Sequence, residues 1–258
     1  MPKKVLFITE GPVDELHLMR SICNDLGLTT SERDFYSYNT DFHHFARVML
    51  PDGADTVDKT IDLLITLKMY ETDAVRLEIL NAAYTDIFII FDFDPHVNTP
   101  EFEKISALAS FFRDSSDMGR LFINYPMMQS YKHLKWLPDN EYEYRKVNIS
   151  EVHDYKKLVS LEGLPELIKT HEYNHLQLYE IAYHNYCKRE KILGRDYDIN
   201  RLYKYDGAED VEILKRQIQD FQKNGQCSVL NTSSLIYLDY IPKKFFNEIT
   251  RHKDKFRI

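Results

Sequence analysis

Residues 86–94 read DIFIIFDFD, an apolar run from Ile87 to Phe91 that ends in two aspartates one residue apart. A stretch this rich in β-branched and aromatic residues predicts a strand buried on both faces, as the strands of parallel sheets are. Side chains two residues apart in an extended chain point the same way, so Asp92 and Asp94 are expected to project together. Two carboxylates that close repel each other unless a proton or a cation lies between them. The carboxyl end of this strand is therefore a candidate functional site.

The surrounding sequence alternates strand and helix patterns. Short apolar runs predict three further strands, at residues 4–9, 34–38 and 120–125. Apolar residues at helical spacing predict helices at residues 13–26, 56–82 and 101–112. Strands that alternate with helices argue for an α/β fold, in which helices cover both faces of a mainly parallel sheet.

The pattern changes past Trp136, where helical periodicity dominates at residues 151–193 and 208–224. Residues 228–238 fit either a strand or a buried helix. We therefore predict a catalytic core over residues 1–137, with a helical insertion at about residues 40–82. Residues 138–258 are expected to form a mostly helical accessory or partner-binding region.

Composition limits the location of the protein. No apolar stretch approaches the roughly 20 residues that cross a bilayer, and MPKKVLFITEGP meets a glutamate and a proline too early for a signal peptide. The three cysteines, Cys23, Cys187 and Cys227, are odd in number and far apart, which disfavours a disulfide framework or a zinc ribbon. We expect a cytoplasmic protein without a membrane partner.

Net charge bears on the choice of ligand. The chain has 33 basic and 41 acidic residues, a net charge of −8, which opposes non-specific attraction to a polyanion. A nucleic-acid substrate would then need a local basic patch, bound cations or a partner protein.

A third carboxylate, Glu10, ends the first predicted strand and precedes Gly11. Functional crevices of open parallel sheets lie outside the carboxyl ends of the strands, so Glu10 is expected on the same edge as Asp92 and Asp94. Mg²⁺ prefers oxygen ligands and often uses only one or two carboxylates. The helix start after Gly11 offers N–H groups to a phosphate. Two plainer interpretations stay open: Glu10 and Asp14 as acids at a helix N-terminus, and Asp92 and Asp94 as helix caps.

Two of these segments resemble a known family. A strand ending in Glu-Gly, here VLFITEGPVDE, paired with a later strand ending in Asp-x-Asp, here IFIIFDFD, resembles the TOPRIM fold of topoisomerases, primases and OLD-type nucleases. The resemblance implies that Glu10, Asp92 and Asp94 gather one or two Mg²⁺ ions for phosphodiester chemistry, with Mn²⁺ as an alternative ion. It adds Asp14 as a further acid that some nuclease branches use.

Residues 123–134, INYPMMQSYKHL, resemble a segment of OLD-like TOPRIM nucleases from bacterial anti-phage systems such as PARIS. That segment usually carries a glutamate where this chain has Gln129, which favours one strongly held metal over two. The resemblance covers roughly residues 4–137. It implies a nuclease that cuts DNA or RNA, tRNA included, under the control of an ABC-type ATPase partner or a homodimer interface.

Basic and aromatic residues follow the last core strand. Lys132 and Lys135, with His133, are candidates to offset charge on a phosphate in the transition state, and a solvated basic face is the alternative. Tyr125 and Tyr131 could stack on bases, although aromatic residues near a strand end are more often part of the core.

Three rival functions are consistent with parts of the sequence. Residues 171–175, HEYNH, match the zinc motif H-E-x-x-H, but the third ligand of the metzincins is absent. The strand ending in Asp-x-Asp also resembles the first motif of haloacid-dehalogenase-like phosphatases, in which Asp92 would be the nucleophile; that interpretation leaves Glu10-Gly11 unexplained. A non-catalytic TOPRIM-like docking module, with an acidic edge that binds a basic partner, is the third.

Overall fold

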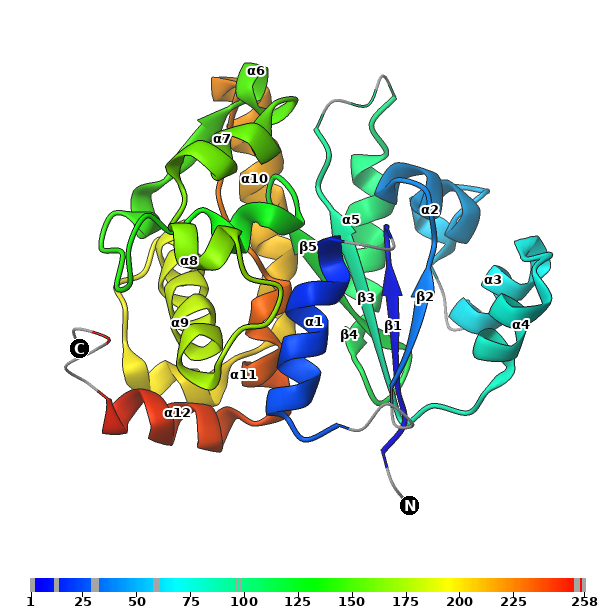
Figure 1. The fold of residues 1–258 in the computed structure, drawn as a ribbon. Coiled ribbons are helices and arrows are strands. Elements are labelled where there is room, and N and C mark those ends of the chain that lie inside the picture. The colour runs from blue at the N-terminus through cyan, green and yellow to red at the C-terminus, as the bar shows by residue number, and fades with distance from the viewer. Residues whose placement is uncertain are drawn as a thin grey trace.

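A computed structural model describes residues 3–11, 14–28, 33–57, 61–95, 97, 99–252 and 256. Its centre is a five-stranded sheet in the order β2-β1-β3-β5-β4 (Figure 1). Four strands are parallel: β1 (Val5–Thr9), β2 (Arg33–Ser37), β3 (Asp86–Asp92) and β5 (Gly119–Asn124). The two-residue strand β4 (Arg113–Asp114) is antiparallel at the edge. The predicted α/β fold with a mainly parallel sheet is confirmed.

Five helices accompany the sheet strands in sequence. They are α1 (Asp14–Asp25), α2 (Phe42–Met49), α3 (Leu63–Tyr70), α4 (Ala74–Asn81) and α5 (Phe102–Phe111). The insertion between β2 and β3 holds α2, α3 and α4. Asp41, Asp62 and Asp73 cap these three helices by accepting hydrogen bonds from backbone N–H groups of the first turn.

The remaining chain is mostly helical. It contains α6 (Ile149–Val152), α7 (Tyr155–Glu162), α8 (Pro165–Ile168), α9 (His175–Ile192), α10 (Asp210–Asn224), α11 (Ile236–Tyr240) and α12 (Pro242–Arg251). This part also contains two short strands that pair antiparallel. They are β6 (Lys146–Asn148), which precedes α6, and β7 (Gln226–Ser228), which follows α10. The stretch at residues 228–238, predicted as either strand or buried helix, is neither throughout: it holds the last residue of β7, an isolated bridge at Leu230, a 3-10 helix at Ser233–Leu235 and the start of α11.

The strand order places a change of direction between β1 and β3. From β1 the chain moves outward to β2, whereas from β3 it moves the opposite way to β5. Right-handed crossovers then place α1 and α5 on opposite faces of the sheet. Figure 1 shows helices on both sides of the strands. A crevice forms at the carboxyl ends where such a reversal occurs, here between β1 and β3.

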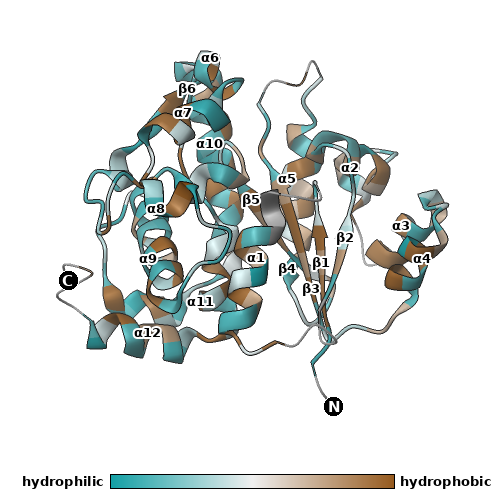
Figure 2. Ribbon diagram, viewed as in Figure 1, coloured by the Kyte–Doolittle hydropathy of each residue, from teal (hydrophilic) through white to brown (hydrophobic). Residues whose placement is uncertain are grey.

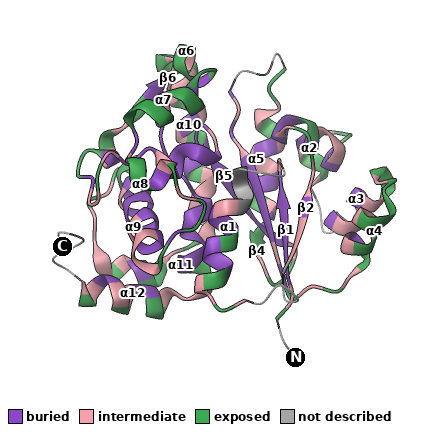
Figure 3. Cartoon of the chain, in the orientation of Figure 1, coloured by how far each residue is buried: buried purple, intermediate pink, exposed green. Residues whose placement is uncertain are grey.

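The apolar core runs through both halves of the chain. The central strands are hydrophobic in Figure 2 and buried in Figure 3, and the core continues into α9, α10 and α11. Residues 230–234 lie along the end of β5: Tyr125 and Leu230 form a β-bridge, and Thr232 Oγ1 donates to the Ile123 carbonyl at 2.8 Å. A domain boundary near residue 138 stays a prediction. Within the described residues, no helix is long and apolar enough to cross a membrane.

Candidate functional site

The end of β1 lies directly against the end of β3. The register pairs Thr9 with Ile90, and the Glu10 N–H donates to the Ile90 carbonyl at 3.2 Å. Glu10 Oε2 accepts a hydrogen bond from the Asp92 N–H at 3.1 Å, across 82 residues of sequence. Glu10 and Asp92 are therefore neighbours at the change of strand direction.

Asp92 also connects β3 to the segment that follows β5. It lies opposite Asn124 in the parallel register, and its Oδ1 accepts a hydrogen bond from the Met128 N–H at 2.7 Å. A carboxylate that accepts a backbone N–H is held in one orientation. The aspartate is thus positioned by the backbone of the neighbouring strand ends.

Asp94 does not continue the extended geometry expected from the sequence. The strand ends at Asp92, and Asp94 has a φ of 33°, a conformation that is uncommon for residues other than glycine. Side chains two residues apart point the same way only in an extended backbone. The strand geometry from which Asp92 and Asp94 were expected to share one face is therefore absent at Asp94.

His43, on α2, holds the Asp94 turn in place. The Glu101 N–H donates to His43 Nδ1 at 2.9 Å, so Nε2 carries the proton and donates to the Asp94 carbonyl at 3.2 Å. Burial lowers the pKa of His43, which favours this neutral form. Sequence reasoning missed this residue, although the apolar spacing of Phe42, Phe45 and Met49 would have placed His43 on a helix.

A shallow, open depression of about 280 Å³ lies at this edge of the sheet. Glu10, Gly11, Asn39, Thr40 and Asp41 line it, so it opens at the carboxyl ends of β1 and β2. The Asn39 N–H donates to the Glu10 carbonyl at 2.8 Å, which fixes the two strand ends against each other. Sequence analysis did not single out Asn39 or Asp41, although polar residues directly after a predicted strand were a usable signal.

The oxygen donors at this edge suit a hard divalent cation. Glu10 Oε2 and Asp92 Oδ1 each accept a backbone N–H, and carboxylate oxygens are ligands that Mg²⁺ prefers. Mg²⁺ often binds through one or two carboxylates and several waters, so this pair fits it. Within the described part of the chain, no three His, Cys, Asp or Glu side chains gather as a metal cluster. The Asp14 side chain lies outside what is described.

The basic candidates after β5 have partners elsewhere. Lys135 Nζ forms an ion pair with Glu162 at 2.8 Å, and Lys132 Nζ lies 5.5 Å from the centre of the Tyr131 ring. His133 is buried between Tyr155 and Glu162, and burial lowers its pKa to about 4. These contacts favour a structural role for His133.

Two further groups from the sequence are in the core. Tyr125 is fully buried, and the buried Tyr131 hydroxyl lies 3.1 Å from the Tyr173 hydroxyl, so neither ring is exposed to stack on a base. Gln129 is largely buried as well.

The HEYNH motif does not form the helical turn that zinc proteases use. Asn174 is the N-cap of α9, so His175 is the first helical residue and His171 lies before the helix. His175 Nδ1 is 2.5 Å from Asp25 Oδ1, and the centre of the His171 ring lies 4.4 Å from that of the His17 ring. Two histidines bind one zinc ion through this motif only when they lie one helical turn apart, so the zinc hypothesis is wrong here.

The chain matches no protein-family model, no curated protein and no solved structure.

Proposed function

We propose that this protein is a Mg²⁺-dependent nuclease with a TOPRIM-like core, in which Glu10 and Asp92 hold the ion. The observation that carries the proposal is the 3.1 Å hydrogen bond from the Asp92 N–H to Glu10 Oε2, which brings two acids from distant segments to one sheet edge. The position at the change of strand direction supports it, because ligands of open α/β sheets bind there.

Each residue has a separate task in this proposal. Glu10 and Asp92 bind the ion; Asp94 and Asp14 are further candidate ligands on the turn after β3 and at the start of α1. When bound, Mg²⁺ supplies charge stabilisation to a scissile phosphate and lowers the pKa of a bound water. Lys132, four residues after the amide that contacts Asp92, and Lys135 are the candidates for offsetting phosphate charge.

The substrate and control are also part of the proposal. The resemblance to anti-phage effectors favours DNA or RNA, tRNA included, as substrate and an ABC-type ATPase partner or a homodimer as the means of control. A chain with a net charge of −8 attracts polyanions poorly, which supports the need for a metal ion or a partner at the site.

The test uses substitutions that keep the hydrogen bonds and remove the charges. In Asp92→Asn and Glu10→Gln, the amide oxygen still accepts the Met128 or Asp92 N–H. We expect cleavage of plasmid, linear DNA or total tRNA with Mg²⁺ or Mn²⁺ to fall by at least about a hundredfold in each variant, and to stop when EDTA is added. Cleavage is measured by gel electrophoresis over time, with and without an ATPase partner.

A matched control lies at the other end of the same strand. Asp86 begins β3 and accepts from Ser115 Oγ at 3.0 Å, so Asp86→Asn makes the same chemical change at the opposite sheet edge. It should cut at the wild-type rate. Cleavage that survives both Asp92→Asn and chelation would refute the assigned site; a phosphatase activity lost in Asp92→Asn would favour the dehalogenase-like alternative.

A further inference from the structure

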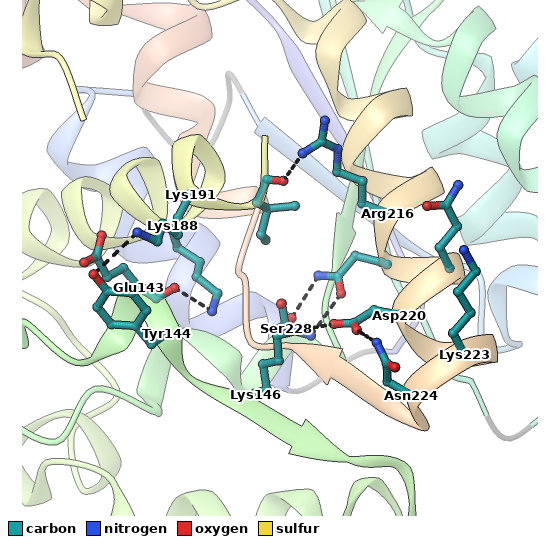
Figure 4. Close-up of a pocket in the computed structure, with 13 residues that line it drawn as sticks. Glu143, Tyr144, Lys146, Lys188, Lys191, Arg216, Asp220, Lys223, Asn224 and Ser228 are labelled. Carbon is teal, nitrogen blue, oxygen red and sulfur yellow. Dashed lines mark hydrogen bonds and ion pairs between the residues drawn. The ribbon is translucent and has the colours of Figure 1, made fainter. Parts of the chain in front are cut away.

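A basic pocket lies in the helical half of the protein, between α9, α10 and β6. Its volume is about 420 Å³, within the range of small-ligand sites. Five basic side chains line it, against two acidic ones. The basic residues are Lys146, Lys188, Lys191, Arg216 and Lys223 (Figure 4). This concentration of positive charge contrasts with the net charge of −8 of the whole chain.

Helical spacing explains how the cations converge. Arg216, Asp220 and Lys223 fall on one face of α10, and Lys188 and Lys191 are three residues apart on α9. Of the two acids, Asp220 already pairs with Lys146 at 2.6 Å. Arg216 pairs with Glu212 at 2.8 Å, so the surplus of positive charge in the lining comes from Lys188, Lys191 and Lys223.

Lys188 is the most unusual group in the pocket. Its side chain is 1% exposed, and its Nζ donates to the carbonyls of Glu143 at 2.9 Å and Arg145 at 2.7 Å. An ammonium group has three N–H donors, so one is left after these two bonds. Burial lowers the pKa of Lys188 to about 7, and a bound anion would offset this cost by restoring the charged form.

The rim adds an aromatic ring. Tyr144 is 61% exposed, and Lys191 Nζ lies 4.7 Å from the centre of its ring. A flat exposed ring beside several cations suits a ligand with both an aromatic base and phosphate groups. The acidic surface of the rest of the chain disfavours a long polyanion, whereas a small ligand would fit inside the pocket.

We propose that this pocket binds a free nucleotide carrying two or more phosphates, with the phosphates on Lys188, Lys191 and Lys223 and the base on Tyr144. The inference is independent of the nuclease assignment, since none of the residues that line this pocket belongs to the proposed metal site.

Binding is measured by calorimetry with the full chain in EDTA, so that metal-dependent chemistry does not contribute. The probes are pyrophosphate, ADP, ATP and a short single-stranded RNA. We expect ADP and ATP to bind, and Lys223→Glu and Lys191→Glu each to weaken binding by about tenfold or more. Lys215→Glu is the matched control, an exposed lysine of the same helix that does not line the pocket, and it should bind as the wild type does.

Tyr144→Ala separates recognition of the base from recognition of phosphate. This variant should weaken the binding of ADP and ATP and leave any binding of pyrophosphate unchanged, because pyrophosphate has no base to stack on the ring. The proposal is overturned if neither ADP nor ATP binds the wild type, if RNA alone binds, or if Lys215→Glu weakens binding as much as Lys223→Glu does.

Discussion

Replacing Arg120 by methionine is expected to lower the free energy of unfolding by about 3–5 kcal/mol, the usual cost of removing one partner from a buried ion pair. Arg120 projects from β5 and is 1% exposed. It forms ion pairs with Asp210 at 2.5 Å and Asp239 at 2.9 Å, and donates to the Tyr205 hydroxyl at 3.1 Å. Burial raises the pKa of Asp239 and Arg120 opposes that rise, so the variant leaves Asp239 without this cation and Asp210 with Arg189 as its remaining ion-pair partner.

The measurement is urea denaturation at neutral pH. The control is Arg113→Met, since Arg113 pairs with Arg120 in the β4–β5 register but is exposed, and it should change stability by less than about 0.5 kcal/mol. Adding Asp210→Asn and Asp239→Asn to Arg120→Met should recover part of the loss, because the two carboxylates that lost Arg120 are then neutral, while Arg189 keeps Glu190 and Glu209. A cost below about 1 kcal/mol for Arg120→Met would contradict this account.

Acid is expected to destabilise the protein well before its carboxylates titrate. Burial lowers the pKa of His133 to about 4, against the opposing effect of its hydrogen bond to Glu162, and burial lowers the pKa of His184 to about 4 as well. An unfolded histidine has a pKa of about 6.5, so the unfolded chain binds protons first as the pH falls. Stability is therefore lost between about pH 6.5 and pH 4, at about 2 kcal/mol per histidine between pH 7 and pH 5.

Urea midpoints at pH 7, 6 and 5 test this expectation. In His184→Gln, the new side chain can accept the Asp139 N–H that His184 Nε2 accepts at 3.1 Å, but it cannot take up a proton. Between pH 7 and pH 5, the free energy of unfolding of this variant should fall by about 2 kcal/mol less than that of the wild type. The free energy of unfolding of His153→Gln, a change at an exposed position, should fall by as much as that of the wild type. Equal losses in all three proteins would rule out His184 as a source of the acid sensitivity.

Local sequence patterns predicted most of the sheet. The apolar runs at residues 4–9, 34–38 and 120–125 became β1, β2 and β5, because an apolar run between turn residues reports a buried strand directly. Sequence patterns did not predict the strands that are very short. The three-residue strand β6 and the two-residue strand β4 have too few residues to show a period, and they exist because a neighbouring strand pairs with them.

The candidate site could be predicted only in part from the sequence. Glu10 and Asp92 could be expected on one edge, since the carboxyl ends of parallel strands lie together whatever the intervening sequence. The turn at Asp94 could not, because its left-handed backbone is held by His43 and Glu101 from two other elements. No short-range pattern contains those contacts.

The sequence by itself determined the fold class, the mainly parallel strands and the edge on which two acids end. Only the tertiary structure decided that Arg120 meets Asp210 and Asp239, which lie 90 and 119 residues away. It also decided that Lys188 is buried in a basic pocket of an acidic chain. The physical reason is that periodicity reports which face of an element is covered, while the identity of the covering segment depends on contacts made across the whole chain.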